Sequence, residues 1–119
     1  MPLMLRSRTI VKAGDALSRK KTNRIPFPHP GETLREDFLK PLEMSANELA
    51  LELRVPPTRM TEIVSGRRSV TADTALRLAR YFNTTPKFWL NLQASYDLAV
   101  AAESKAREIE RTVRPHAAA

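Results

Sequence analysis

The sequence predicts an all-α protein, in which a five-helix domain carries a helical C-terminal extension and a flexible basic N-terminal tail. Apolar residues after position 30 recur every three or four positions, which is the period of a helix. No segment alternates apolar and polar residues as a half-buried strand does. Proline and glycine interrupt the helical pattern at short intervals, so we expect the helices to be short.

Length and composition place the chain among globular proteins of one domain. It has 119 residues, of which 42% are hydrophobic and 28% are charged. No uncharged stretch is long enough to span a membrane, and the first residues lack the pattern of a secretory signal. Cysteine is absent, which excludes disulfides, thiolate metal sites and cysteine nucleophiles. We therefore expect a protein of the reducing cytoplasm, without a membrane partner.

The net charge of +7 is unevenly distributed and divides the chain into three parts. Residues 1–24 carry seven Lys or Arg against one Asp and have no sustained apolar period, so we expect a flexible basic tail. Its cluster at 19–21 fits either a solvated tail or an arm that binds phosphates without sequence preference. Residues 25–97 hold nine basic and nine acidic side chains and form the expected domain. Residues 98–119 form the helical extension and a short tail.

A proline-rich linker precedes the first helix. Three prolines within 25–31 favour extended backbone, and Pro30 suits the first turn of the helix that follows. We predict this helix over 32–39 and expect Pro41 to end it. Its apolar stripe is formed by Leu34, Phe38, Leu39 and Leu42.

The second and third helices are separated by the breaker Val-Pro-Pro at 55–57. Ser45 opens the second helix, and Glu48 three residues later completes the pattern of a capping box. A proline of the breaker starts the third helix, and Gly66 follows it as a C-terminal cap. The residues expected on the inner faces of these helices are Leu49, Ala50, Leu53, Met60, Ile63 and Val64.

The fourth and fifth helices have clear starting signals. Thr71 caps the fourth, with Asp73 near its positively charged end, and Thr85 with Pro86 starts the fifth. The extension over 98–113 is helix-prone by composition but has few large apolar residues. The fifth helix carries Phe88, Trp89, Leu92 and Tyr96. The expected buried face of the fourth helix is formed by Ala75, Leu76, Leu78, Ala79 and Phe82.

Residues 46–65 carry the main functional signal, because two short helices joined by a tight turn form a helix-turn-helix. The helices cross closely only where one position is small, and Ala50 supplies it. Polar residues outside the apolar stripe of the second helix are typical of a recognition helix that enters the major groove. An ordinary amphipathic hairpin would show part of this pattern as well. The candidate DNA contacts of this helix are Pro57, Thr58, Arg59, Thr61, Glu62 and Ser65.

Several of these side chains have more than one possible role. Arg59 fits a fork onto guanine, whereas Glu62 fits either an acceptor for cytosine or an ion pair with Arg59. Arg67 and Arg68 follow the recognition helix, where they grip the DNA backbone or remain solvated in a loop.

The starts of two helices offer further candidates. Backbone N–H groups at a helix start favour phosphate, so Ser45, Asn47 and Thr33 are candidates there. Capping of the helix explains Ser45 and Thr33 equally well.

No enzyme or metal site is predicted. His29 and His116 are far apart, and no third ligand joins them into a zinc site. Glu36 and Asp37 are adjacent on a helix and therefore point to different sides. Only three glycines occur, which excludes a phosphate-cradling loop, and no nucleophile stands with a base, so we expect no cofactor.

Three strings of residues carry a resemblance to a family. They are PGETLREDF at 30–38, TEIVSGRRSVTADTALRLARYF at 61–82 and PKFWLNLQ at 86–93. Together they resemble HigA-type antitoxins of the Xre and lambda-repressor-like class, over roughly residues 26–100. The resemblance implies a homodimer that represses its own operon by binding double-stranded operator DNA. It also implies neutralisation of a HigB-type toxin, a RelE-like ribosome-dependent mRNA endonuclease.

Other functions fit parts of the same pattern. A stand-alone regulator without a toxin, or a toxin inhibitor that has lost DNA binding, would share the fold. Relatives of the wider class usually have Gln where this chain has Ala46, and Gly in the turn where this chain has Arg54. A residue other than Gly at Arg54 must adopt a positive φ unless the turn differs.

The last candidate site is a dimer seam after the core helices are complete. Trp89, Leu92 and Leu98 supply its apolar surface. Trp89 with Phe88 fits the core equally well, and an aromatic ligand pocket is a weaker reading.

Overall fold

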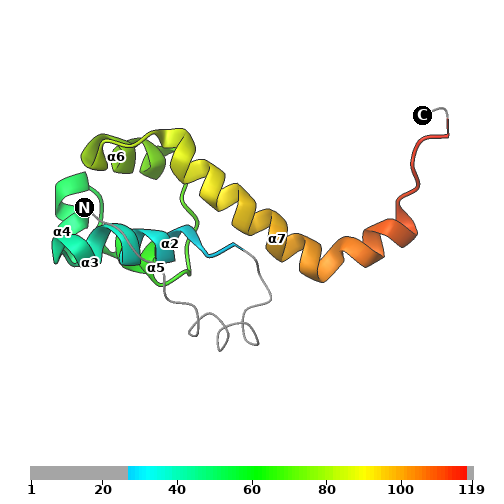
Figure 1. Cartoon of the computed structure of the whole chain (residues 1–119), viewed down its shortest axis with the longest axis horizontal. Helices are drawn as coiled ribbons and strands as arrows, with labels where there is room; N and C mark the ends of the chain where they lie inside the picture. Colours follow the sequence, from blue (N-terminus) through cyan, green and yellow to red (C-terminus); the bar gives the residue numbers. More distant parts are fainter. Residues whose placement is uncertain (1–26, 118–119) are drawn as a thin grey trace.

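The computed structural model describes residues 27–117, and within them every regular element is a helix (Figure 1). The first helical segment consists of α2 (Pro30–Thr33), the π-helix η1 (Leu34–Leu39) and α3 (Lys40–Leu42). Then follow α4 (Ala46–Leu53), α5 (Pro57–Val64), α6 (Ala72–Phe82) and α7 (Pro86–Thr112). The predicted five-helix, all-α domain is thereby confirmed, whereas the predicted basic tail over 1–24 lies outside the described residues.

The predicted caps form in α4 and α5. Ser45 Oγ accepts a hydrogen bond from the Glu48 N–H at 3.0 Å, and Glu48 Oε1 accepts one from the Ser45 N–H at 2.8 Å. Pro57 is the first residue of α5, and Gly66 lies just past its end with φ 83°. Local sequence signals therefore set the start of α4 and both ends of α5.

The first helical segment departs from the prediction, because it begins at Pro30 and continues through Pro41 to Leu42. A proline inside an α-helix collides with the carbonyl four residues earlier. Here the turn before Pro41 is π-helical, and the Lys40 N–H bonds to the carbonyl of Arg35, five residues back. This wider turn accommodates the proline, and the segment ends instead at Glu43, which has a φ of 53°.

One core joins all five helices. Its fully buried side chains include Leu34, Leu49, Met60, Ile63, Leu78 and Trp89. The prediction was wrong for Leu42 and Leu76, which are 57% and 59% exposed. Each residue turns the helix by about 100°. Leu76 is therefore rotated away from the face that Ala75 and Ala79 bury.

Gly31 and His29 hold the start of α2 against the end of α5. Gly31 is buried, and a Cβ on it would overlap the backbone oxygen of Ile63. His29 Nδ1 accepts a hydrogen bond from the Gly31 N–H at 2.8 Å, and its ring packs edge-on against Tyr96 of α7. Burial lowers the pKa of His29, although the charge of Asp97 and the backbone of Arg68 act in the opposite direction. A neutral His29 thus links three elements.

The helix α7 has 27 residues, and its distal half projects away from the domain (Figure 1). The boundary that we predicted between 97 and 98 falls inside this helix. Near its start, Trp89 is fully buried and its Nε1 donates to Thr84 Oγ1 at 2.8 Å. Trp89 therefore belongs to the core of one chain, and its assignment to a dimer seam was wrong. No helix within residues 27–117 is long and apolar enough to cross a membrane.

We predict that Gly31→Ala lowers the free energy of unfolding by about 2–3 kcal/mol, because the new methyl group forces α2 away from the backbone of α5. Urea unfolding followed by circular dichroism measures this loss. Gly66→Ala is the matched control, since an alanine is strained at a φ of 83° but its Cβ would meet no atom closer than the ordinary contact of 3.9 Å to His29. It is expected to cost about 1–2 kcal/mol. A loss at Gly31 no larger than at Gly66 would contradict the close approach.

Candidate nucleic-acid interface

The corner between α4 and α5 has the geometry of a helix-turn-helix. α4 ends at Leu53 and α5 begins at Pro57, so only three residues connect the two helices. Arg54 adopts φ 62°, and its N–H bonds back to the carbonyls of Ala50 and Leu51. Ala50 is fully buried at the helix crossing. The predicted sharp corner is therefore present, with a left-handed arginine in the place of the usual glycine.

The outer side of α5 presents a polar stripe. Thr58, Thr61, Glu62 and Ser65 recur every three or four positions, so they share one face of the helix. Thr58 and Ser65 are exposed, and Thr61 and Glu62 are half-buried at its edge. The Thr61 hydroxyl donates to the Thr58 carbonyl at 3.2 Å, and the Ser65 hydroxyl donates to the Glu62 carbonyl at 3.1 Å. These hydroxyls consequently meet a ligand as hydrogen-bond acceptors.

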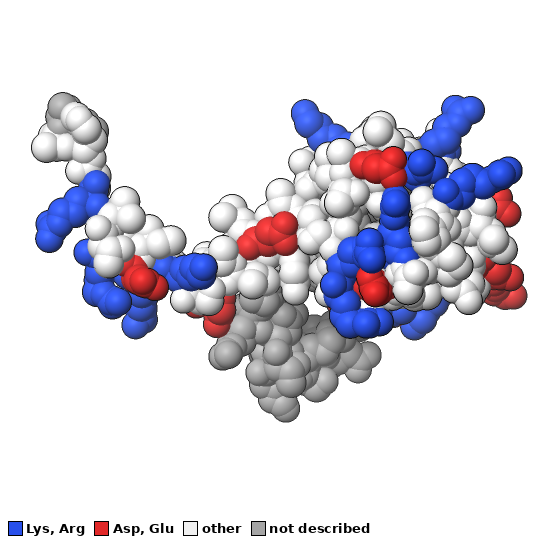
Figure 2. Space-filling model, turned by 180° about the vertical axis from the view of Figure 1, so that it is seen from behind, with Lys and Arg blue, Asp and Glu red and all other residues white. Residues whose placement is uncertain are grey.

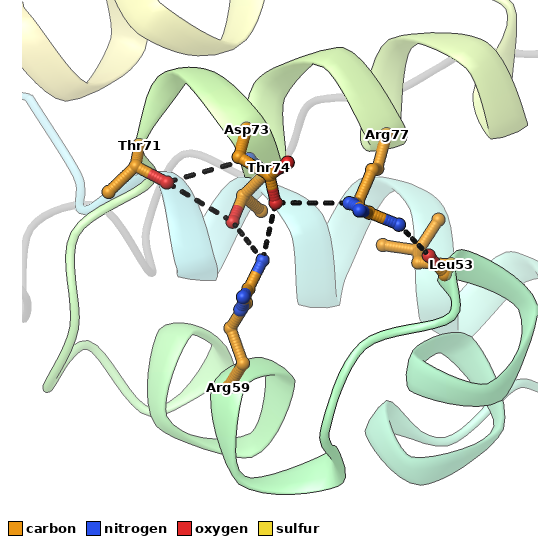
Figure 3. A network of polar contacts seen from close by, with 6 residues as sticks. All are labelled: Leu53, Arg59, Thr71, Asp73, Thr74 and Arg77. Atoms are coloured by element: carbon orange, nitrogen blue, oxygen red, sulfur yellow. Dashed lines mark hydrogen bonds and ion pairs between the residues drawn. The ribbon is translucent and has the colours of Figure 1, made fainter.

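Arg59 does not belong to this polar stripe, although it lies on the same helix. Its guanidinium reaches α6, where NH1 donates to Asp73 Oδ2 at 2.7 Å and lies 3.5 Å from Thr74 Oγ1 (Figure 3). Its side chain is 28% exposed. The sequence-based pairing of Arg59 with Glu62 was therefore wrong. The role that the structure gives Arg59 is to hold α5 against α6.

Asp73 joins this contact to the end of α4. Its Oδ2 also accepts from Arg77 Nε at 3.0 Å, and Arg77 NH1 donates to the Leu53 carbonyl at 2.9 Å (Figure 3). Hydrogen bonds from Arg59, and then from Arg77, hold the pKa of Asp73 below its usual value. We call Arg59, Asp73 and Arg77 the arginine latch, since it ties α6 to both helices of the corner.

A further arginine secures the end of α5. Arg35 of η1 donates from NH1 to the Val64 carbonyl at 3.0 Å, where the helix leaves carbonyls without a partner of its own. Neither Arg35 nor Arg77 was predicted as a site residue. Their carbonyl partners lie 29 and 24 residues away, so no local spacing marks them.

The loop after α5 carries two exposed arginines with different partners. Arg67 Nε donates to Ser65 Oγ at 3.0 Å, which leaves its charge uncompensated by this contact. Arg68 forms an ion pair with Glu62 at 2.8 Å. Glu62 is thus ion-paired as expected, but with the loop and not with Arg59.

At the start of α4, the capping box occupies both the hydroxyl and the N–H of Ser45. The Ser45 N–H is therefore committed to Glu48, whereas the hydroxyl oxygen acts only as an acceptor there and keeps its own hydrogen for a phosphate. Asn47 is exposed in the first turn. Thr33 lies inside the first helical segment and not at its start, which removes it as a phosphate candidate.

Charge on the domain is mixed. Figure 2 shows Lys and Arg interspersed with Asp and Glu on this face of the domain, and not gathered into one basic patch. Among the described residues, no group of three or more His, Asp or Glu side chains is arranged to hold a metal ion. Because the charge is mixed, the feature that favours nucleic acid is the shape of the site. An exposed helix α5 followed by a loop is suited to the groove of a DNA duplex.

Comparison with known proteins agrees with this geometry. A family model described as helix-turn-helix matches residues 36–89. Virulence-associated protein I of Dichelobacter nodosus is 53% identical over 83 residues, which cover 70% of this chain and 77% of that protein. A HigA-family addiction module antidote protein from Coxiella burnetii has a TM-score of 0.71 and 52% identity, covering 75% of this chain and 97% of that one. The chain belongs to the HigA family of helix-turn-helix proteins.

A second solved structure adds information about DNA. The Pseudomonas aeruginosa antitoxin HigA, solved with its higBA promoter, has a TM-score of 0.72 and 42% identity, covering 74% of this chain and 96% of that one. The HigA family is one of regulators and antitoxins and not of enzymes, which confirms the prediction that this chain is not an enzyme. Ala46, where the resemblance led us to expect a glutamine, offers no polar group at the start of α4.

We predict that Asp73→Asn and Arg59→Met are coupled, because both changes break one contact of the arginine latch. Each variant is expected to lower the urea midpoint of unfolding, and the double variant to lower it by less than the sum. Asp73→Asn combined with Arg80→Met is the control, since Arg80 is exposed on the same helix and forms no ion pair within the described residues. If the changes in urea midpoint for Arg59→Met and Asp73→Asn were additive, the two residues would not interact and the arginine latch would be contradicted.

Proposed function

We propose that this HigA-type chain represses its own operon by sequence-specific binding of double-stranded operator DNA, and that it neutralises a HigB-type toxin. The observation that carries the DNA part is the exposed polar stripe of α5, held outward by a corner that other elements fasten. The promoter-bound P. aeruginosa HigA supports it. An operator-binding protein works beside the chromosome, so the proposal includes the cytoplasmic location.

The residues divide into two roles on DNA. Thr58, Thr61 and Glu62, with Pro57 and Ser65 beside them, face the base edges. Because the hydroxyl hydrogen of Thr61 is used within the helix, its oxygen accepts from the amino group of adenine or cytosine. Arg67 and Arg68 of the loop, and Asn47 at the start of α4, contact the phosphate backbone. Arg59 positions the recognition helix and does not itself read a base.

The proposed assembly is a homodimer formed by the distal half of α7. Leu98, Ala102, Ala106 and Ile109 follow one another at intervals of three or four, which places them on one face of α7. Leu98 is 72% exposed and Ile109 is 51% exposed. Trp89 takes no part in this seam, and Leu92 is half-buried against the core of its own chain.

The distribution of charge along the distal half of α7 favours its pairing with a second copy of this chain. Asp97 and Glu103 lie toward the beginning of this half, whereas four basic side chains outnumber two acidic ones over 105–114. An antiparallel pair of helices therefore brings opposite charges together at both ends of the seam. A dimer also presents two recognition helices to successive turns of one face of the duplex, about 34 Å apart.

For the dimer, Ile109→Glu is expected to raise the dissociation constant at least tenfold. Dimerisation would bury the new carboxylate between the two helices without a partner, which costs free energy. Sedimentation equilibrium measures this change. Ser104→Glu adds the same charge on the opposite face of α7 and is expected to leave the constant within a factor of two. A wild-type chain that is monomeric at micromolar concentration would contradict the seam.

For DNA, the wild-type chain is expected to bind a duplex from immediately upstream of its own operon in preference to a shuffled duplex. Arg67→Ala is expected to reduce the slope of log K against log salt by about 1.8, because the dimer loses one phosphate contact from each chain. Lys87→Ala, an exposed charge at the start of α7, is the control. A gel-shift series at several salt concentrations measures both.

The same binding series and a co-purification decide among the remaining functions. Equal affinity for the upstream and shuffled duplexes would contradict the proposed repressor. A toxin inhibitor that has lost specific DNA binding would then be the remaining function. Co-purification with the product of the adjacent reading frame supports the antitoxin. Specific DNA binding without any such partner would favour the stand-alone regulator.

A further inference from the structure

Glu62 occupies an unusual place for an acidic side chain. It is the single carboxylate of α5, and it stands on the polar stripe between Thr58 and Ser65, in the part of the molecule assigned above to DNA. A negative charge there repels the phosphates of any duplex that approaches. Its side chain remains 30% exposed, so it is not buried for the sake of the fold.

The carboxylate of Glu62 is committed to a loop arginine. Arg68 Nε and NH2 both lie 2.8 Å from Glu62 Oε1. This pair neutralises one of the two loop cations, whereas Arg67 contacts the uncharged Ser65 hydroxyl and keeps its charge. The loop therefore offers one cation that is always available and one that is available only when Glu62 releases it.

The exchange that would release Arg68 follows from the chemistry of base edges. A carboxylate in the major groove accepts a hydrogen bond from the amino group of cytosine. An ion pair as exposed as this one is weak, so a base amino group competes for the same oxygen. Glu62 then gives up Arg68, whose guanidinium becomes free to bind phosphate.

We propose that Glu62 determines specificity by exchanging Arg68 for a cytosine amino group. On DNA without cytosine at that position, the Glu62–Arg68 pair stays closed and Arg68 makes no phosphate contact. On the operator, the pair opens and Arg68 grips the backbone. This inference rests on the proposed DNA-binding function and adds the means by which non-specific binding is kept low.

The test compares Glu62→Gln with wild type on the upstream and shuffled duplexes described above. On shuffled DNA, the variant is expected to bind more tightly and with a salt slope steeper by about 1.8, since Arg68 of each chain of the dimer is freed for one phosphate. The ratio of operator to shuffled affinity is expected to fall roughly tenfold, because the neutral amide oxygen of Gln accepts more weakly from the base than the carboxylate does. Circular dichroism and thermal unfolding confirm that the variant keeps the fold.

Two control variants separate this exchange from a simple change of net charge. Glu52→Gln removes the same charge from an exposed position of α4 and is expected to leave the ratio unchanged. Arg68→Ala in the wild-type background is expected to lower the salt slope on the operator but not on shuffled DNA. In the Glu62→Gln background, it is expected to lower the slope on both.

The outcomes distinguish this inference from the proposed function. Equal behaviour of Glu62→Gln and Glu52→Gln, or an equal loss of slope for Arg68→Ala on both duplexes, would overturn the exchange. A wild-type chain without preference for the upstream duplex would overturn the proposed function instead. In that case the release of Arg68 is tested on shuffled DNA alone. The salt slope of binding must still be steeper for Glu62→Gln than for the wild type.

Discussion

Two helices of eight residues each form the corner, and helices so short are not stable on their own. The corner depends on being fastened from outside. Its apolar side is buried by the core, and its last free carbonyls receive guanidinium groups from other elements. Arg77 of α6 binds the Leu53 carbonyl, and Arg35 of η1 binds the Val64 carbonyl. The C-terminal end of each helix of the corner, where an isolated helix would fray, is thereby fixed.

This use of arginine changes how the charge of the domain should be interpreted. A basic protein is readily taken to bind nucleic acid through its net charge, yet the domain over 25–97 is neutral overall. Arg59 and Arg77 share Asp73, and Arg68 is held by Glu62. Most arginines near the corner therefore stabilise it or are held in ion pairs, so the net charge of the domain is a poor guide to where nucleic acid would bind.

The helix α7 combines two tasks along one continuous rod. Its first turns anchor the core through Trp89, and Gln93 Oε1 accepts a hydrogen bond at 2.7 Å from the Val70 N–H in the segment that leads to α6. Its distal half projects from the domain with Leu98 and Ile109 exposed. A rigid connection between core and projecting half means that contacts at the far end can set the orientation of the recognition helix.

The sequence by itself determined the helices and their ends. Ser45 with Glu48, Pro57, Gly66 and Thr71 act within a few residues of themselves, so their effect can be worked out from local chemistry. The corner between α4 and α5 followed from the same signals, and so did the family, because its strings of residues are long. The continuation through Pro41 was missed, since a π-helical turn has no simple local signal.

The tertiary structure alone decided which polar groups meet. Arg59 bonds to Asp73, 14 residues away, and not to its neighbour Glu62. Trp89 lies in the core and Leu98 on the surface, although both stand on the same helix with similar hydrophobicity. Such outcomes depend on how helices pack in space. Spacing along a chain specifies the face on which a side chain stands, but the partner on that face is supplied by another part of the fold.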